Sequence, residues 1–190
     1  GSTGYDRHFA LLENEIWSLF HDHDRDIQET IMTDYDPEWF TLNGRSYSQT
    51  IALNDDPNNA PGWLPHYGTS SGIVTTNTTL GTADRSQPNS SLIQANAGDR
   101  VLIRLANLGY RQNSMELPGI PMHVIGQDAS LLRNGSTDTS YFTNHIYIGP
   151  GEARDVLFTA PPKTGTGAYD VYYFKNRDWR KLSNNGLPGP

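Results

Sequence analysis

The sequence contains no cysteine. This absence excludes disulfides, metal centres built on thiolates, and thiol nucleophiles. It leaves the cellular compartment open, because a chain without cysteine is compatible with both reducing and oxidising surroundings.

Long apolar runs and an excess of positive charge are also missing. No stretch approaches the roughly 20 consecutive apolar residues that a membrane-spanning helix requires. The formal net charge is −7, which argues against nucleic-acid binding because phosphate groups require a cationic surface. We therefore expect neither a membrane span nor a nucleic-acid partner.

Glycine and proline, by contrast, are abundant. The 190 residues include 18 Gly and 12 Pro, which favours turns and short strands over long helices. The length suits one domain with an insertion, so we predict a single domain over residues 1–190. Residues 52–90 are crowded with Asn, Asp, Pro, Gly, Ser and Thr and are expected to form a long loop insertion. The small, polar residues 1–4 are expected to be a cloning scar or a cut domain boundary.

Short β-like runs separated by turn residues fill most of the chain. In one of them Val101, Ile103 and Leu105 alternate with other residues and so share one face of a strand. One short helix is expected within residues 24–33, with Asp24 as its N-cap. Strands at this spacing, without long helices between them, favour an antiparallel β-sandwich. Strands are predicted at 9–13, 39–42, 101–106, 122–125 (ended by Gly126), 145–148, 156–159 and 168–174.

The stretch "SLFHDHDRD" (18–26) places His21 and His23 one residue apart. On an extended strand such a pair points both imidazoles to the same face, a geometry that suits copper or zinc. The segment is highly charged and follows the first predicted strand, which favours a surface role. These two residues are weak metal candidates, and no other metal ligand is assigned. The remaining histidines are isolated and are expected in core, surface or hydrogen-bonding roles: His8, His66, His123 and His145.

Other catalytic arrangements find no support in the sequence. There is no G-x-S-x-G nucleophile elbow. The alternating acids Asp22, Asp24 and Asp26 lack the central glycine and terminal glutamate of a calcium-binding loop. No residue is assigned a catalytic or cofactor-binding role.

Four phrases stand out by their order and spacing: "WFTLNGRSY" (39–47), "AGDRVLIRLANLG" (97–109), "PMHVIGQDASLL" (121–132) and "IYIGPGEARDVLFTAP" (146–161). Together they resemble the plastocyanin-like (cupredoxin) domains of multicopper oxidases, the laccase-like enzymes, and they are most similar to the middle domain of the three-domain members. The resemblance implies an all-β fold, a cupredoxin-like Greek-key β-sandwich.

Several residues within these phrases have a physical reason to be there. The pair Asn43-Gly44 permits the left-handed backbone of a tight turn. Glu152, after a Pro-Gly bend, is expected to accept hydrogen bonds from turn amides. Arg154 and Asp155 are expected to form a local ion pair. We assign these residues to the fold and not to chemistry.

The resemblance also implies where a copper centre would lie. A type 1 copper site uses two His and one Cys, and copper-bearing domains of this family carry that Cys on a late strand. The corresponding segment here, "AYDVYYFKNRD", offers Tyr172, Tyr173 and Phe174, and the H-x-H of another strand is reduced to His123. We therefore predict that aromatic rings fill the position of the metal and that this domain contains no copper. Copper would belong to the parent enzyme, the longer protein of which this chain would be a part.

By resemblance, the parent oxidises a substrate at type 1 copper and reduces dioxygen to water at a trinuclear cluster. Phenols and metal ions are both open as its substrates. This chain would be a structural spacer between sister cupredoxin domains, would help to wall the substrate site, and would have no oxidase activity alone. Because members of the family are usually exported, the resemblance implies that the parent lies in the periplasm, at the cell surface or outside the cell.

Two other functions remain open at this point. One is a free-standing β-sandwich module that binds carbohydrate or protein through Trp63, Tyr67 and Trp179. The other is a small metal-binding protein centred on His21 and His23, which predicts stoichiometric uptake of copper or zinc. Exposed apolar patches would favour the oxidase fragment, whereas a single aromatic platform would favour the binding module.

Overall fold

A computed structural model describes residues 4–22, 30–47, 50, 91–184 and 187–188. The chain divides into two compact units. The first comprises Gly1–Glu13 and Leu92–Asp178, and the second comprises Asn14–Ser91 and Trp179–Pro190. The loop insertion expected at 52–90 and residues 1–3 of the expected scar lie outside the described residues.

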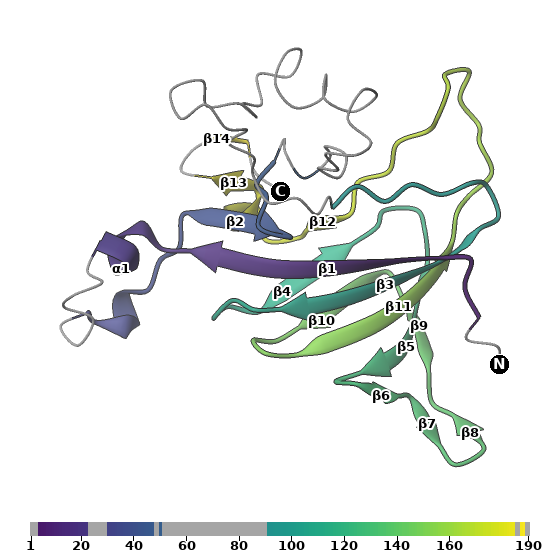
Figure 1. Ribbon diagram of the computed structural model, residues 1–190, viewed down its shortest axis with the longest axis horizontal. Coiled ribbons are helices and arrows are strands. Elements are labelled where there is room, and N and C mark those ends of the chain that lie inside the picture. The colour runs from purple at the N-terminus through teal and green to yellow at the C-terminus, as the bar shows by residue number, and fades with distance from the viewer. Residues whose placement is uncertain (1–3, 23–29, 48–49, 51–90, 185–186, 189–190) are drawn as a thin grey trace, which may run out of the picture. The chain divides into compact units, whose positions relative to one another are not determined.

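The first unit is built on one large sheet (Figure 1). Within this unit, the order of strands across the sheet is β1 (Arg7–Ile16), β3 (Arg100–Asn107), β11 (Ala153–Thr159), β5 (Met122–Gln127) and β6 (Ser130–Leu131). β9 (Tyr141–Thr143) also pairs with β5. β1 continues beyond Glu13, so its last residues belong to the second unit.

The pairing of β1 with β3 is parallel, running from Arg7 opposite Val101 to Glu13 opposite Asn107. The prediction of an antiparallel sandwich is therefore wrong for this pair. Parallel neighbours need a long crossover connection, and residues 17–99 provide one. β11 is antiparallel to both of its neighbours, β3 and β5, as predicted.

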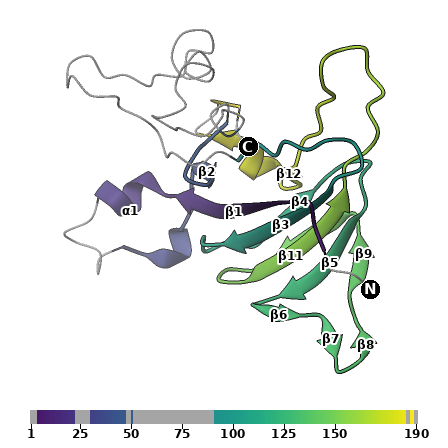
Figure 2. The ribbon, with the colours of Figure 1, turned by 45° about the vertical axis from the view of Figure 1, so that its right-hand side comes forward.

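A second sheet in the same unit has the order β10 (His145–Ile148), β4 (Asn113–Glu116) and β12 (Lys175–Asn176), all antiparallel. A short hairpin, β7 (Arg133–Asn134) and β8 (Thr137–Asp138), follows β6 along the chain. In two views that differ by 45° this hairpin projects away from the main sheet beyond β6 (Figures 1 and 2).

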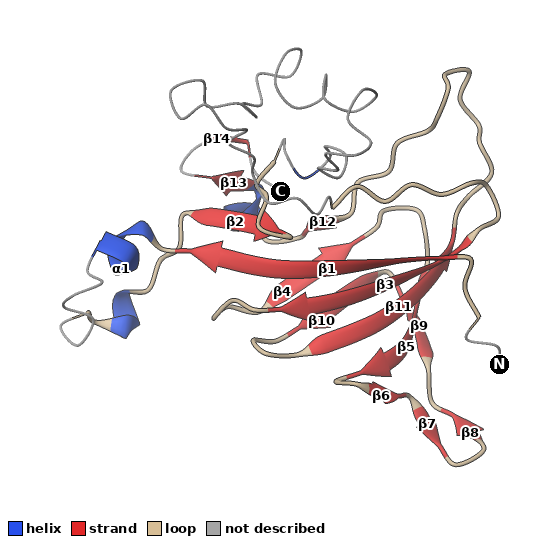
Figure 3. Cartoon of the chain, viewed as in Figure 1, coloured by secondary structure: helices blue, strands red, loops and turns tan. Residues whose placement is uncertain are grey.

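Apolar residues of both sheets form the core of the first unit. Successive strand residues point to opposite faces, and the two sheets bury their facing sides as a β-sandwich does. On the opposite face of the main sheet, Leu102, Ile125 and Leu157 form a further buried cluster. The predicted all-β, Greek-key sandwich is confirmed, and short helices are few among the described residues (Figure 3). The apolar side chains of the first unit that are at most 3% exposed are Leu11, Val101, Leu102, Ile103, Leu105, Met115, Met122, Val124, Ile146, Ile148, Val156 and Leu157.

The second unit combines short elements around a partly polar interior. Phe40 and Leu42 are buried, and the Lys181 ammonium lies 5.8 Å from the centre of the Phe40 ring and 3.7 Å from the Glu15 carboxylate. No helix among the described residues is long and apolar enough to cross a membrane. The elements of the second unit are α1 (Ser18–Asp22), η2 (Met32–Asp34), β2 (Trp39–Leu42), η6 (Trp179–Leu182), β13 (Ser183–Asn184) and β14 (Leu187–Pro188).

Several predicted elements agree with the structure. The strands predicted at 39–42 and 145–148 match β2 and β10 in full. The turn at Asn43-Gly44 is confirmed by backbone φ angles of 53° and 75°. Most of the helix predicted at 24–33 lies outside the described residues, which omit 23–29. At its end Met32–Asp34 is a 3-10 turn, and a separate short helix, α1, lies before it at Ser18–Asp22.

Gly126 does not end its strand, because β5 continues to Gln127. A Cβ at Gly126 would lie 3.0 Å from the Cβ of Asp155 on the neighbouring strand, where the register shifts. Glycine here therefore accommodates a close approach between strands rather than a break.

The late strand predicted at 168–174 is wrong. Only Lys175–Asn176 forms a strand, β12, which pairs with Glu116 and Met115 at the end of β4. Because β4 ends at Glu116, the residues before Lys175 have no neighbouring strand there to bond with.

Candidate functional site

His21 lies on α1 and is exposed to solvent. The alternation that places an H-x-H pair on one face of a strand does not apply at a helical residue. His23 lies outside the described residues. Within the part of the chain that the structure describes, no three or more His, Cys, Asp or Glu side chains gather as a metal site would require. A metal role for His21 and His23 stays a hypothesis.

The aromatic residues expected to fill a buried copper position do not do so. Tyr172 is 43% exposed and Tyr173 is 59% exposed, while Phe174 is half-buried. The prediction is wrong because the segment is a loop. Without a strand, its side chains do not alternate into the space between the sheets, and the core is filled mainly by aliphatic residues instead.

His123, on β5, lies in a chain of hydrogen bonds. Its Nε2 atom is 2.7 Å from Oγ of Ser140, and that hydroxyl is 2.6 Å from Oδ1 of Asp138. A carboxylate only accepts hydrogen bonds, so Ser140 donates to Asp138 and accepts from the Nε2–H of His123. The His123 ring also stacks on Phe142, with centroids 4.3 Å apart.

The same hydrogen bonds stabilise the charge of Asp138. Ser140 donates to its carboxylate through both its hydroxyl and its backbone amide, and these two bonds lower the pKa of Asp138 from its usual value. The sequence identified His123 as an isolated histidine but gave no indication of its partners, since Ser140 lies 17 residues away.

These residues do not match the donor set of a type 1 copper centre. That centre needs two imidazoles and a thiolate. The chain has no cysteine, Nε2 of His123 is bonded to Ser140, and the tyrosines of the late segment face solvent. The described residues of the first unit therefore do not fit this kind of copper site.

Residues 161–174, which connect β11 to β12, form what we call the tyrosine loop. Asp170 braces it by accepting hydrogen bonds from the Thr164 amide at 2.7 Å, the Thr164 hydroxyl at 3.1 Å and the Gly165 amide at 3.0 Å. These bonds, led by that of the Thr164 amide, lower the pKa of Asp170. Lys163 also donates its ammonium to the carbonyl of Gly165.

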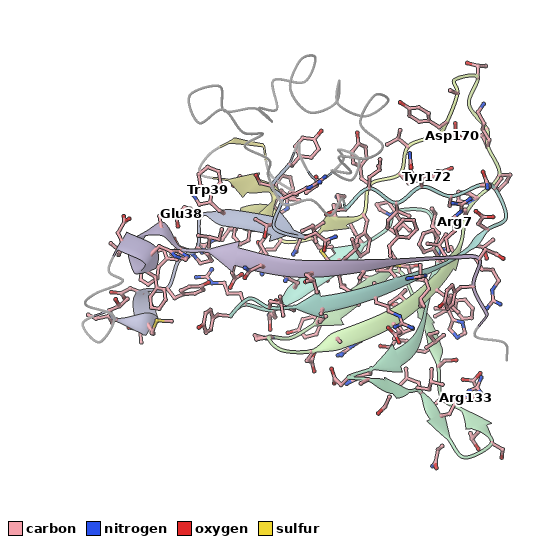
Figure 4. The ribbon with its side chains drawn as sticks, viewed as in Figure 1. Arg7, Glu38, Trp39, Arg133, Asp170 and Tyr172 are labelled. Carbon is pink, nitrogen blue, oxygen red and sulfur yellow. The ribbon has the colours of Figure 1, made fainter. Side chains whose placement is uncertain are left out.

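Beyond this brace the tyrosine loop presents large apolar side chains to solvent. Figure 4 shows Asp170 and Tyr172 on the loop at one end of the first unit. The sequence predicted a strand here because aromatic residues favour strands. The threonines and glycines of "KTGTGAYD", which are typical of a turn, could have indicated the loop. The exposed fractions are 75% for Tyr169, 61% for Val171, 43% for Tyr172 and 59% for Tyr173.

The turn before β11 follows the sequence prediction in part. Glu152 accepts a hydrogen bond from the Gly149 amide at 2.6 Å, as predicted. Arg154 pairs with Glu152 at 3.0 Å and lies 3.7 Å from Asp128. The predicted Arg154–Asp155 ion pair is wrong, because consecutive strand residues point to opposite faces; the carboxylate of Asp155 lies 4.0 Å from Arg104 instead.

The fold and sites described so far define a cupredoxin-like β-sandwich. The family described as multicopper oxidase matches residues 18–186 of the sequence. The chain therefore belongs to the multicopper oxidase family. No curated protein matches it at the level of sequence.

Solved structures of multicopper oxidases share the fold. The blue copper oxidase of Nitrosomonas europaea is 13% identical, with a TM-score of 0.60 over 95% of this chain and 40% of its own. The multicopper oxidase mgLAC is 17% identical, with a TM-score of 0.61 over 96% of this chain and 41% of its own. The laccase of Botrytis aclada is 18% identical, with a TM-score of 0.53 over 96% of this chain and 27% of its own. The chain thus spans less than half the length of these relatives.

Proposed function

We propose that this chain is one copper-free domain of a multicopper oxidase, a structural spacer between sister cupredoxin domains that bear the copper. Its share in the enzyme is to set the separation of those domains and to help wall the substrate site. The parent couples oxidation of a phenol or a metal ion to reduction of dioxygen to water, outside the cytoplasm. The chain alone is inactive.

One observation carries this proposal: the late segment, where copper-bearing domains of the family hold their cysteine, is here the tyrosine loop. Its side chains offer no thiolate or imidazole, and Asp170 is engaged in bracing the backbone. The hydrogen bond from His123 to Ser140 is a second argument, because it engages one of the two nitrogens of the single histidine on β5.

The lengths of the related chains support the existence of sister domains. This chain covers 40% of the Nitrosomonas europaea oxidase and 27% of the Botrytis aclada laccase. A parent of comparable length has room for further domains. The family match also supports copper as the cofactor of that parent.

The proposal is tested with the purified 190-residue chain. Calorimetric titration with Cu²⁺ is expected to show no tight, stoichiometric uptake, and the product should lack the intense blue absorption of a type 1 centre. Assays with a phenol, Mn²⁺, Fe²⁺ or Cu⁺ under oxygen should show no turnover. Weak uptake that disappears in a His21→Ala/His23→Ala variant would be adventitious, whereas a blue colour retained in that variant would contradict the proposal.

A carbohydrate- or protein-binding module is the second candidate, and one observation favours it. Trp179, at the start of η6, is 87% exposed, as the side chain of a binding platform would be. Trp63 and Tyr67 lie outside the described residues. Binding of soluble glycans by the chain, lost in Trp179→Ala, would favour this candidate over the spacer.

A further inference from the structure

We infer that the exposed apolar side chains of the tyrosine loop are a docking surface for a sister cupredoxin domain of the parent oxidase. The inference rests on the proposed function and adds to it the part of the chain that makes the contact. The side chains concerned are Tyr169, Val171, Tyr172 and Tyr173.

Hydrogen bonds within the tyrosine loop hold its conformation without a partner. Asp170 lies within the apolar run and ties it to Thr164 and Gly165 through hydrogen bonds of 2.7–3.3 Å. A Cβ on Gly165 would lie 2.5 Å from Oδ1 of Asp170, so a larger residue here would displace the Asp170 carboxylate. A surface that is already ordered loses less conformational entropy on binding, which favours its use in recognition.

The chemistry of the surface matches a protein partner with an apolar face. Tyrosine is enriched among the residues that dominate protein interfaces. The two charged side chains of the loop, Lys163 and Asp170, are directed to backbone groups of the loop itself. The exposed run from Tyr169 to Tyr173 therefore offers ring faces and hydroxyls but only one charged group, which is already bonded.

A domain of the same polypeptide suits this surface better than a second copy of the chain. Stable association of free proteins takes about 800 Å² from each partner, more than four side chains supply. A tethered domain has a high effective concentration, so a small patch is sufficient. The related oxidase chains, of which this chain covers 27–41%, show that such further length is typical.

Hydrogen exchange in the isolated chain and in the parent tests the inference. The amides of residues 169–173 are expected to exchange about tenfold or more slowly in the parent, because docking removes them from solvent. The β7–β8 hairpin, residues 133–138, serves as the internal control and should exchange at the same rate in both. Equal rates for residues 169–173 in both proteins would overturn the inference.

A variant of the parent separates docking from a general change in stability. Tyr172→Ser/Tyr173→Ser should return the exchange of Tyr169 and Val171 to the rate of the isolated chain. Leu131→Ser, which replaces another exposed apolar residue, on β6, should leave the protection intact. If both variants lose it equally, the loop is not the docking surface.

The outcomes distinguish this inference from the proposed function. A parent without further cupredoxin domains, or one with copper bound by residues 1–190, would refute the spacer role itself. A parent with copper-bearing sister domains and an unprotected tyrosine loop would refute only the docking surface. Protection that appears in the isolated chain as its concentration rises would assign the surface to a second copy and would also overturn the inference.

Discussion

The Nε2 atom of His123 lies 2.7 Å from Oγ of Ser140, and this hydrogen bond joins β5 to the residues that lead from the β7–β8 hairpin to β9. The same serine hydroxyl donates a hydrogen bond to the carboxylate of Asp138. A half-buried histidine on a strand of the main sheet is thereby part of the structure that fixes a peripheral hairpin.

Ser140→Ala removes the acceptor of His123 and one donor to Asp138. Loss of the bond to the half-buried imidazole should lower the free energy of unfolding by about 1 kcal/mol, measured by urea denaturation. Ser136→Ala changes an exposed serine of the same hairpin and should have little effect. Equal stability of both variants would mean that the His123–Ser140 bond does not contribute.

The loop position of the tyrosines predicts that they contribute little to stability. Tyr172→Ser and Tyr173→Ser should each change the free energy of unfolding of the isolated chain by less than about 0.5 kcal/mol. Ile148→Ala, at a side chain with no exposed surface, should cost about 2–5 kcal/mol. Thermal and urea denaturation check both values. A large loss in the tyrosine variants would restore the idea that these rings fill a core pocket.

Asp99, which directly precedes β3, accepts a hydrogen bond from Arg7 on β1, and this contact makes the stability of the fold depend on pH. The hydrogen bond from the side chain of Arg7, at 2.5 Å, and then that from the Asn96 amide lower the pKa of Asp99 below 3.8. Because the pKa is lower in the folded state, this carboxylate stabilises the fold above pH 3.8, and the contribution is lost as the pH falls through the folded value.

Arg7→Leu should therefore raise the pKa of Asp99 toward 3.8. A carbon-detected NMR titration of the Asp99 carboxyl group measures it directly. The variant should also show a weaker dependence of unfolding free energy on pH below that value. An unchanged titration midpoint would show that Arg7 is not the main cause.

Asp170→Ala should loosen the tyrosine loop without unfolding the sandwich. The amides of Thr164 and Gly165 lose their acceptor, so their hydrogen exchange should become severalfold faster while that of β3 is unchanged. Gly165→Ala should have a similar effect, because its Cβ would collide with the Asp170 carboxylate. Exchange that stays slow in both variants would contradict the role of Asp170 as a brace.

Several features of the fold could be predicted because their causes are local. The alternation of Val101, Ile103 and Leu105 predicts that these three side chains share a buried face of β3, since side chains on a strand alternate whatever the tertiary context. The turn at Asn43-Gly44 follows from the freedom of those residues to adopt positive φ.

The errors arise where the outcome depends on a neighbour. Residues 168–174 have the composition of a strand, but the strand opposite them ends at Glu116. Arg154 and Asp155 are adjacent in sequence but point to opposite faces. Arg154 pairs with Glu152 and lies near Asp128, whereas Asp155 lies near Arg104.

The sequence by itself determined the family, through the resemblance of its four phrases, and the β-sandwich, through strand alternation. It also excluded a cysteine-ligated copper centre, because the chain has no cysteine. Only the tertiary structure decided that β1 runs parallel to β3, that His123 bonds to Ser140, and that the late tyrosines face solvent. These depend on contacts between residues far apart in the chain, and such contacts form only when the sheets come together.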